Sequence, residues 1–158
     1  MKSVPVNTCK KGVNVFDVST AHFLKKFATH LKEKRLVTPQ PYTSLVKCSY
    51  SNELAPLDPD WFYLKSAAVA RQIYVSKSTT LGVGSLRRLF AKKARRGVNT
   101  NTTSLAGGKI VRDIVKQLRK AGFVEQYKSS EGATFGLLIT KLGRSQMDKV
   151  AQALSRSG

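Results

Sequence analysis

The densest cluster of chemically capable side chains in this chain is a short run of cations. Six Lys and Arg residues fall within the eleven residues from Leu86 to Arg96, and the stretch from Trp61 to Arg112 holds eleven cations and no acidic residue. The six are Arg87, Arg88, Lys92, Lys93, Arg95 and Arg96. Cations at this density repel one another, so binding of a polyanion stabilises the folded chain. The cluster predicts contact with phosphate, which Arg binds through two N–H groups and Lys as a point charge. A nuclear localisation patch and a solvated helix face are the alternative interpretations.

A second group of candidate contacts lies on a helix that we predict over residues 60–74. Pro59 fixes φ at the first helical position, and Asp58 can accept hydrogen bonds from the free N–H groups there. At about 100° per residue, apolar or small side chains cover more than half of the circumference. The polar stripe that is left consists of Trp61, Lys65, Gln72 and, at its edge, Arg71. This stripe could contact an anion, with Trp61 stacked on an unpaired base. Alternatively, Trp61 closes the core and the charges are solvated.

The third group lies on residues 109–121, the segment with the clearest helical periodicity in the chain. Its apolar side chains fall within about 140° on one side of the helix. The other side carries Lys109, Arg112, Lys116, Arg119 and Lys120. A helix that reads DNA needs polar side chains aimed at base edges, and only Gln117, near the margin, is of that kind. The face suits phosphate more than bases. A winged-helix DNA-binding regulator that uses this helix is the alternative to a protein that binds structured RNA.

The composition indicates one domain with a polyanionic partner. The chain has 158 residues, a hydrophobic fraction of 41% and a formal net charge of +19. The apolar fraction is enough for a core, and the charge points first to nucleic acid and second to an acidic membrane surface. No apolar run is long enough to span a membrane, and the N-terminus has no apolar segment of a secretory signal. We therefore expect neither a membrane span nor a secretory signal.

Catalytic and metal chemistry find no support in the residue pattern. The acidic residues are scattered, and neither His22 nor His30 has a Ser or Cys partner in a recognisable motif. Cys9 and Cys48 have no zinc-ligand spacing, and we expect both to be reduced thiols. The glycine-rich phosphate loops of nucleotide-binding proteins are absent. We expect no enzyme activity, no cofactor, no metal and no small-molecule substrate.

The order of the predicted elements is that of a mainly α, winged-helix-like helical domain with one β-hairpin. We predict this domain over residues 17–154, between a basic N-terminal tail (1–16) and a C-terminal end (155–158). Before the helix 60–74, we expect a helix from Asp17 or Ser19 to about Lys34 and a short helix over 42–48, with Leu45 and Val46 inward. After it, we expect a turn at 82–84, a short helix over 85–96 capped by Ser85, a polar loop over 97–108, the helix 109–121, a hairpin over 123–139 with its turn at 129–132, and a helix from Thr140 to about Leu154.

Three stretches of the sequence together resemble one family. They are ELAPLDPDWFYLKSAAVARQIY (53–74), GVGSLRRLF (82–90) and KIVRDIVKQLRKAGFVE (109–125). The chain is similar, over about residues 15–154, to the small-subunit ribosomal protein nineteen family of the eukaryotic and archaeal type. The resemblance implies a non-enzymatic protein in the head of the small ribosomal subunit. It implies binding to small-subunit rRNA and to neighbouring ribosomal proteins, and a role in rRNA maturation and subunit assembly. It also implies a cytoplasmic, ribosomal location, with a nucleolar assembly stage if the source is eukaryotic.

Position by position, the resemblance implies an RNA-facing surface that includes Trp61, Arg71, the turn at 82–85, Arg87 or Arg88, and Arg112. Where the family usually has Arg and then Ser in the central helix, this chain has Lys65 and Ala68, so a forked contact at 65 and a hydroxyl contact at 68 are not expected. Contacts of the loop at 91–108 and of the N-terminal tail are not carried over from the family. Together, the residue pattern and the resemblance predict RNA contacts at Trp61, Lys65, Arg71, Arg87, Arg88, Lys92, Lys93, Arg95, Arg96, Lys109, Arg112 and Lys116.

Overall fold

The computed structural model describes residues 12–76, 81–128 and 134–157. Its elements in chain order are the 3-10 helix η1 (Val15–Asp17), helix α1 (Thr20–Glu33), the 3-10 helix η2 (Pro41–Ser44), helices α2 (Trp61–Val75) and α3 (Val83–Leu89), strands β1 (Lys92–Ala94) and β2 (Thr102–Ser104), helix α4 (Gly108–Lys120), strands β3 (Val124–Lys128) and β4 (Thr134–Ile139), and helix α5 (Lys141–Ser157). The strands form two antiparallel pairs, β1 with β2 and β3 with β4.

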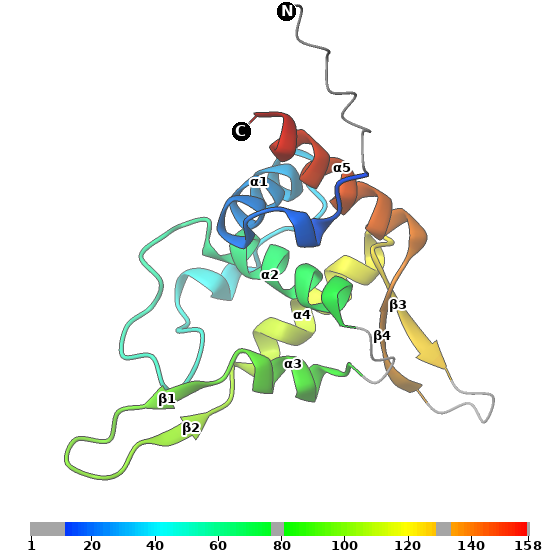
Figure 1. Cartoon of the computed structure of the whole chain (residues 1–158). Coiled ribbons are helices and arrows are strands. Elements are labelled where there is room, and N and C mark those ends of the chain that lie inside the picture. Colours follow the sequence, from blue (N-terminus) through cyan, green and yellow to red (C-terminus); the bar gives the residue numbers. More distant parts are fainter. Residues whose placement is uncertain (1–11, 77–80, 129–133, 158) are drawn as a thin grey trace, which may run out of the picture.

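Helix α2 lies at the centre of the fold and packs against α1, α4 and β4 (Figure 1). On the side away from the predicted polar stripe, the apolar side chains of Phe62, Val69 and Ile73 are buried. The small side chains of Ala67 and Ala70 are buried too, which lets the neighbouring elements approach closely. This burial confirms the predicted phase of the helix. A helix that is apolar or small over more than half of its circumference packs on several sides.

Helices α2, α3 and α4 with the β3–β4 hairpin form a winged-helix-like arrangement, which confirms the predicted fold class. The apolar face of α4 is buried as its periodicity predicts. Its buried residues are Ile110, Val111, Ile114, Val115 and Leu118. Gly122 follows α4 with φ +75°, a conformation that glycine adopts without steric cost. The chain can therefore reverse at once into β3, and the hairpin packs beside the helix.

Thr140 connects the end of the hairpin to α5. Its hydroxyl donates a hydrogen bond to the carbonyl of Gly122 at 2.6 Å and accepts one from the N–H of Gly143 at 3.0 Å. The second bond is the helix cap that the sequence predicts. Helix α5 packs against α1 and continues to Ser157, beyond the predicted end near Leu154. Most of the predicted C-terminal end is therefore helical.

The segment after α3 corrects two predicted elements. The sequence predicts a helix over 85–96 and a polar loop over 97–108, but α3 ends at Leu89 and strand β1 pairs with β2, with Lys92 opposite Ser104. In a helix, Arg88, Lys92 and Arg96 would lie one above another at spacings of four, where like charges destabilise. In the hairpin, Gly97 takes φ +63° and allows the chain to reverse. The helix also begins earlier than predicted, because Gly82 and not Ser85 is its N-cap.

Smaller differences concern the connections. The short helix predicted over 42–48 is the single 3-10 turn η2, and Leu45, predicted to point inward, is 84% exposed. Of the predicted tail, Val15 is fully buried and belongs to η1, which packs against α5. Asp58 does not cap α2, because its carboxylate accepts the N–H of Asp60, which precedes the helix. Helix α2 begins at Trp61 with Asp60 as its N-cap, so Pro59 lies before the helix and not at its first position. Residues 1–11, which include Cys9, and the predicted turn at 129–132 lie outside the described residues.

Candidate nucleic-acid interface

The β1–β2 hairpin carries the core of the predicted cation cluster. Lys92, Lys93, Arg95 and Arg96 all have exposed side chains, and Val98 beyond them is fully exposed. The hairpin projects from the body at the opposite end from α1 and α5 (Figure 1). Four cations on a short projecting element produce a concentrated positive field, which attracts a polyanion before contact is made.

Hydrogen bonds to the base of the hairpin hold it against the body. The Nε of Arg87 donates to the carbonyl of Ala106 at 2.9 Å, and the N–H of Ala106 donates to the carbonyl of Arg87 at 3.2 Å. The loop before α2 adds a β-bridge between Ser49 and Ala106, and the N–H of Gly107 donates to the carbonyl of Cys48 at 2.9 Å. Arg87 thus has a structural role that the sequence does not reveal.

Arg87 and Arg112 approach each other at the start of α4. A Cβ built on Gly108 would lie 3.3 Å from Arg87 Nε and 3.3 Å from Arg112 Nη1. The two guanidinium groups therefore flank the same residue, although 25 positions separate them in the sequence. Gly107 is the N-cap of α4, and no side chain caps this end of the helix. The first N–H groups of a helix and its dipole add to the positive potential of the two guanidinium groups.

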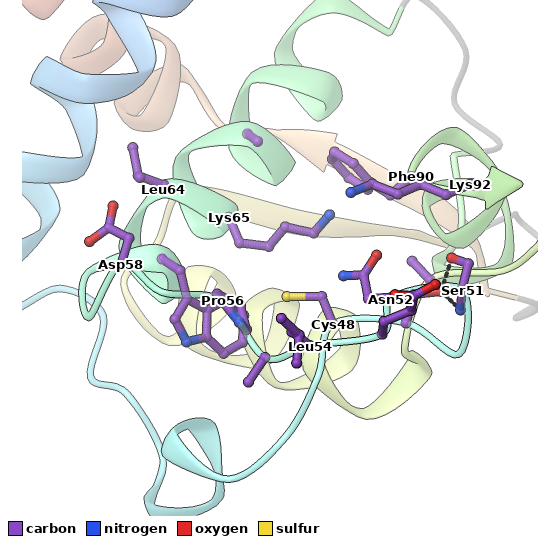
Figure 2. A pocket seen from close by; sticks show the side chains of 16 residues that line it. Cys48, Ser51, Asn52, Leu54, Pro56, Asp58, Leu64, Lys65, Phe90 and Lys92 are labelled. Carbon is purple, nitrogen blue, oxygen red and sulfur yellow. Dashed lines mark hydrogen bonds between the residues drawn. The ribbon is translucent and has the colours of Figure 1, made fainter. Parts of the chain in front are cut away.

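A groove of about 790 Å³, which we call the Lys65 groove, lies between α2, the loop at 48–58 and the start of the hairpin (Figure 2). Trp61, Lys65 and Lys92 line it, so the structure brings together three of the predicted contact residues. Ala68 lines the same wall of α2. The Trp61 ring is half-buried and packs edge-to-face on Phe62, so Trp61 both closes the core and borders the groove.

The ammonium of Lys65 is held against an aromatic ring. It lies 3.6 Å from the centre of the Phe90 ring, and Figure 2 shows the side chain crossing the groove towards Phe90. Burial lowers the pKa of Lys65 below its ordinary value, and the charge of Lys92 acts in the same direction. Burial also raises the pKa of the nearby Cys48 thiol. Phe90 lines the groove and holds the Lys65 ammonium, whereas the sequence predicts it only as an apolar anchor of the helix over 85–96.

The other predicted contact residues lie apart from the groove. Arg71 is half-buried on α2 and does not line the groove; its Nε is buried and has no hydrogen-bond partner among the described residues. Arg88 is exposed on α3 and Lys116 on α4. Lys109 lies with its ammonium 4.3 Å from the centre of the Tyr42 ring. The predicted residues therefore form a discontinuous surface that extends over α2, α3, β1 and α4.

The connection between α1 and α2 covers part of the polar face of α4. The N–H of Thr38 donates to Gln117 Oε1 at 2.8 Å, and Gln117 Nε2 donates back to the Thr38 carbonyl at 2.9 Å. The hydroxyl of Tyr42 donates to the carboxylate of Asp113. Burial and this bond raise the pKa of Tyr42 to about 12. The only amide side chain on this helix is therefore occupied within the protein.

Two further findings bear on the predicted site. Within residues 12–76, 81–128 and 134–157, no group of three or more His, Cys, Asp or Glu side chains could hold a metal ion. In the same part of the chain, no helix is long and apolar enough to cross a membrane.

Comparison with known proteins decides the family. The family model described as Ribosomal protein S19e matches residues 14–157. The chain belongs to the S19e family of ribosomal proteins. It is 37% identical to small ribosomal subunit protein eS19 of Entamoeba histolytica over 138 residues, which are 87% of this chain and 84% of that relative. It is 35% identical to eS19B of Schizosaccharomyces pombe over 143 residues, which are 90% of this chain and 95% of the relative. It is 36% identical to eS19A of Saccharomyces cerevisiae over 141 residues, which are 89% of this chain and 93% of that relative.

Membership of the S19e family confirms the resemblance that the three sequence stretches carry. The matched residues include all of α1 to α4 and the β1–β2 hairpin. The family is one of ribosomal proteins and not of enzymes. The cations of the hairpin and the Lys65 groove therefore lie in the part of the chain that is homologous to these relatives.

Proposed function

We propose that this protein is a structural component of the small ribosomal subunit that binds small-subunit rRNA and supports its maturation and the assembly of the subunit head. The observation that carries the proposal is the projecting hairpin with four exposed cations, in a chain whose relatives are named small ribosomal subunit proteins. The protein would hold rRNA by neutralising phosphates where helices converge. Its expected location is the cytoplasmic ribosome, with a nucleolar assembly stage in a eukaryotic source.

We propose two kinds of phosphate contact, one for the cations of the hairpin and one for the two Arg residues beside α4. Lys92, Lys93, Arg95 and Arg96 would follow a phosphate backbone along the hairpin, because their side chains are exposed and close together. Arg87 and Arg112, beside the N-terminus of α4, suit one fixed phosphate. These contacts read backbone position and shape, not base sequence, as is usual for folded RNA.

The stripe of α2 would supply the rigid border of the RNA surface. Trp61 is half-buried, which leaves part of its ring free to stack on an unpaired base. Lys65 is already engaged with Phe90, so its charge adds to the local potential more than to a direct contact. Arg71 is half-buried at the edge of this stripe, and its guanidinium would add positive charge to the border.

The structure disfavours the alternative of a DNA-binding regulator that reads bases through α4. A recognition helix needs a free polar face. In this protein Gln117 is bonded to Thr38, Asp113 to Tyr42, and Lys109 lies over the Tyr42 ring. The connection that supplies Thr38 and Tyr42 therefore covers part of the polar face of α4.

Binding to RNA fragments that tile the small-subunit rRNA tests this function. One variant replaces the four hairpin cations by Gln, and a matched control replaces four exposed cations that lie on α1, at its C-cap and on α5. The control residues are Lys25, Lys26, Lys34 and Lys149. Both variants lose the same charge. In the hairpin variant, the slope of log affinity against log salt concentration should fall by about three to four, which is about one per lost phosphate contact.

The control variant should keep most of its affinity and slope. Equal losses in both variants would mean that only net charge matters and that the hairpin is not the site. A duplex DNA of the same length serves as competitor. If it displaces the rRNA fragment at equal concentration, the proposed preference for folded RNA is wrong.

A further inference from the structure

The loop between η2 and α2 exposes large apolar side chains that folding does not bury. Tyr50 is 79% exposed, Leu54 77% and Leu57 96%. Single exposed apolar residues are common, but three within eight residues concentrate apolar surface on one loop, and we call these three side chains the apolar patch. Exposed apolar surface of this kind marks interaction sites. Of these three side chains, Leu54 also lines the Lys65 groove, so the patch borders a concave surface at that residue.

The charge of this loop is opposite to that of the rest of the protein. The loop, residues 45–60, contains three acidic residues, Glu53, Asp58 and Asp60, and one cation, Lys47, in a chain with 28 cations and nine acidic residues. The Lys47 ammonium lies 5.9 Å from the centre of the Tyr50 ring. Asp60 forms an ion pair with Lys32 at 2.7 Å. Glu53 and Asp58 are exposed, and neither forms an ion pair with a residue that the structure describes. The loop therefore presents two carboxylates beside the apolar patch.

The loop has a fixed shape. Ser49 Oγ donates to the carbonyl of Leu105 at 3.1 Å, and the N–H of Asn52 donates to the carbonyl of Ser49 at 3.2 Å. Pro56 and Pro59 restrict the backbone on either side of Leu57. A surface that is already ordered loses little conformational entropy when it binds, so more of the interaction energy appears as affinity.

We infer that residues 50–58 are a docking surface for another protein, specifically for a segment in which Lys or Arg residues lie close to apolar side chains. An RNA backbone would be repelled by Glu53 and Asp58, and it offers no apolar surface to cover Leu54 and Leu57. A cationic segment satisfies both requirements, because its charges face the carboxylates and its apolar side chains enter the patch. The inference rests on the proposed function in one respect, which is that the partner is a protein of the assembled small subunit.

Photo-crosslinking within assembled subunits tests the docking surface. A photoreactive phenylalanine analogue, benzoylphenylalanine, replaces Leu54 in a tagged copy of the chain, and a second copy carries it at Val98 on the hairpin. Small subunits are isolated and illuminated, and the crosslinked residues are identified by mass spectrometry. From position 54, we expect a crosslink to a ribosomal protein, at a segment with Lys or Arg within a few residues. From position 98, we expect crosslinks to rRNA.

A charge-reversal variant makes the test specific for the chemistry of the surface. Glu53→Lys, combined with the probe at position 54, should lower the yield of the protein crosslink by about fivefold. The reason is that residue 53 would then repel the Lys or Arg residues of the partner segment instead of attracting them. The same substitution should leave the rRNA crosslink from position 98 unchanged. Circular dichroism of the purified variants checks that they are folded.

The outcomes separate the two proposals. A crosslink from position 54 to rRNA, or to no protein of the subunit, overturns the docking surface, while rRNA crosslinks from position 98 still support the proposed function. A yield that Glu53→Lys does not change overturns the charge argument. If the tagged chain is absent from small subunits, the proposed function itself is overturned, and the docking surface with it.

Discussion

Gln117 and Thr38 are joined by two hydrogen bonds that run in opposite directions. The Gln117 side chain accepts the N–H of Thr38 at 2.8 Å and donates to its carbonyl at 2.9 Å, so an amide side chain pairs with the backbone as a neighbouring strand would. This pair connects α4 to the segment after α1 across 79 positions of sequence. A residue that could have read bases instead fixes the position of a connection.

Gln117→Ala should therefore lower the stability of the folded protein. Each hydrogen bond contributes a net of about 0.5–1.5 kcal/mol, so the free energy of unfolding should fall by about 1–2 kcal/mol. Urea unfolding followed by circular dichroism measures this change. Lys116→Ala, on the exposed side of the same helix, is the control and should change stability by less than about 0.5 kcal/mol. Equal effects of the two variants would contradict a specific role for the pair.

Lys65 and Phe90 should be energetically coupled. An ammonium 3.6 Å from the centre of an aromatic ring is a cation–π contact, and partial burial strengthens it. In a double-mutant cycle of Lys65→Met and Phe90→Leu, we expect a coupling energy of about 0.5–2 kcal/mol. Urea unfolding of the four proteins gives the value. A coupling energy near zero would show that Lys65 is free to contact RNA directly.

Gly143→Ala should destabilise the protein although Ala favours helix. A Cβ at this position in α5 would lie 2.6 Å from the carbonyl oxygen and 3.1 Å from the Cα of Phe123, and neither backbone atom can move aside easily. We expect a loss of about 1–3 kcal/mol in thermal or urea unfolding, typical of overpacking.

Gly84→Ala is the matched control for this substitution. Gly84 is also helical, and a Cβ there meets nothing within 4 Å. Ala should raise stability at this position by up to about 1 kcal/mol through helix propensity. Stabilisation of both variants would contradict the close packing of Gly143 in α5 against the backbone of Phe123.

His30 should make stability depend on pH below neutrality. Burial between α1 and α5 lowers the pKa of His30 below 6.5, and the charge of Lys34 lowers it further. The unfolded chain then binds a proton more readily than the folded chain, so stability is fully present above about pH 6.5 and falls as the pH drops through that value. His30→Gln should flatten this part of the pH profile.

The measurement is urea unfolding at several pH values between about 5 and 8, the range in which His titrates. His22→Gln is the control, because His22 is exposed on the same helix. It should leave the profile as it is in the unsubstituted protein. A profile that rises towards acid pH would mean that His30 is stabilised in its charged form.

Apolar periodicity predicted α1, α2 and α4 because each buries apolar side chains that lie along one side of the helix. The β1–β2 hairpin has no such stripe, since only Ala94 of its first strand is buried. It forms because Arg87 and Ser49 contact the Ala106 segment, and these contacts depend on tertiary structure. Leu45 illustrates the same limit, because an apolar residue was predicted to be buried and lies on the surface.

In the candidate site too, sequence identified the residue types but not the contacts that they make in the fold. Residue type and spacing identified the cations, whose exposed positions on the hairpin need no particular partner. Sequence could not show that Arg87 bonds to Ala106, that Lys65 rests on Phe90 or that Gln117 bonds to Thr38. Each of these partners lies on another element. Such contacts decide which polar side chains remain available to a ligand.

The short spacing between the hairpin and the core helices has a thermodynamic consequence. Strand β1 starts three positions after the last residue of α3, and α4 starts four positions after the last residue of β2. A polyanion that binds the hairpin therefore binds the folded state of the whole core and not a separate flexible arm. By linkage, rRNA bound as proposed would raise the melting temperature of the protein. A core substitution far from any phosphate would then weaken the complex, once it lowers the fraction of folded protein appreciably below one.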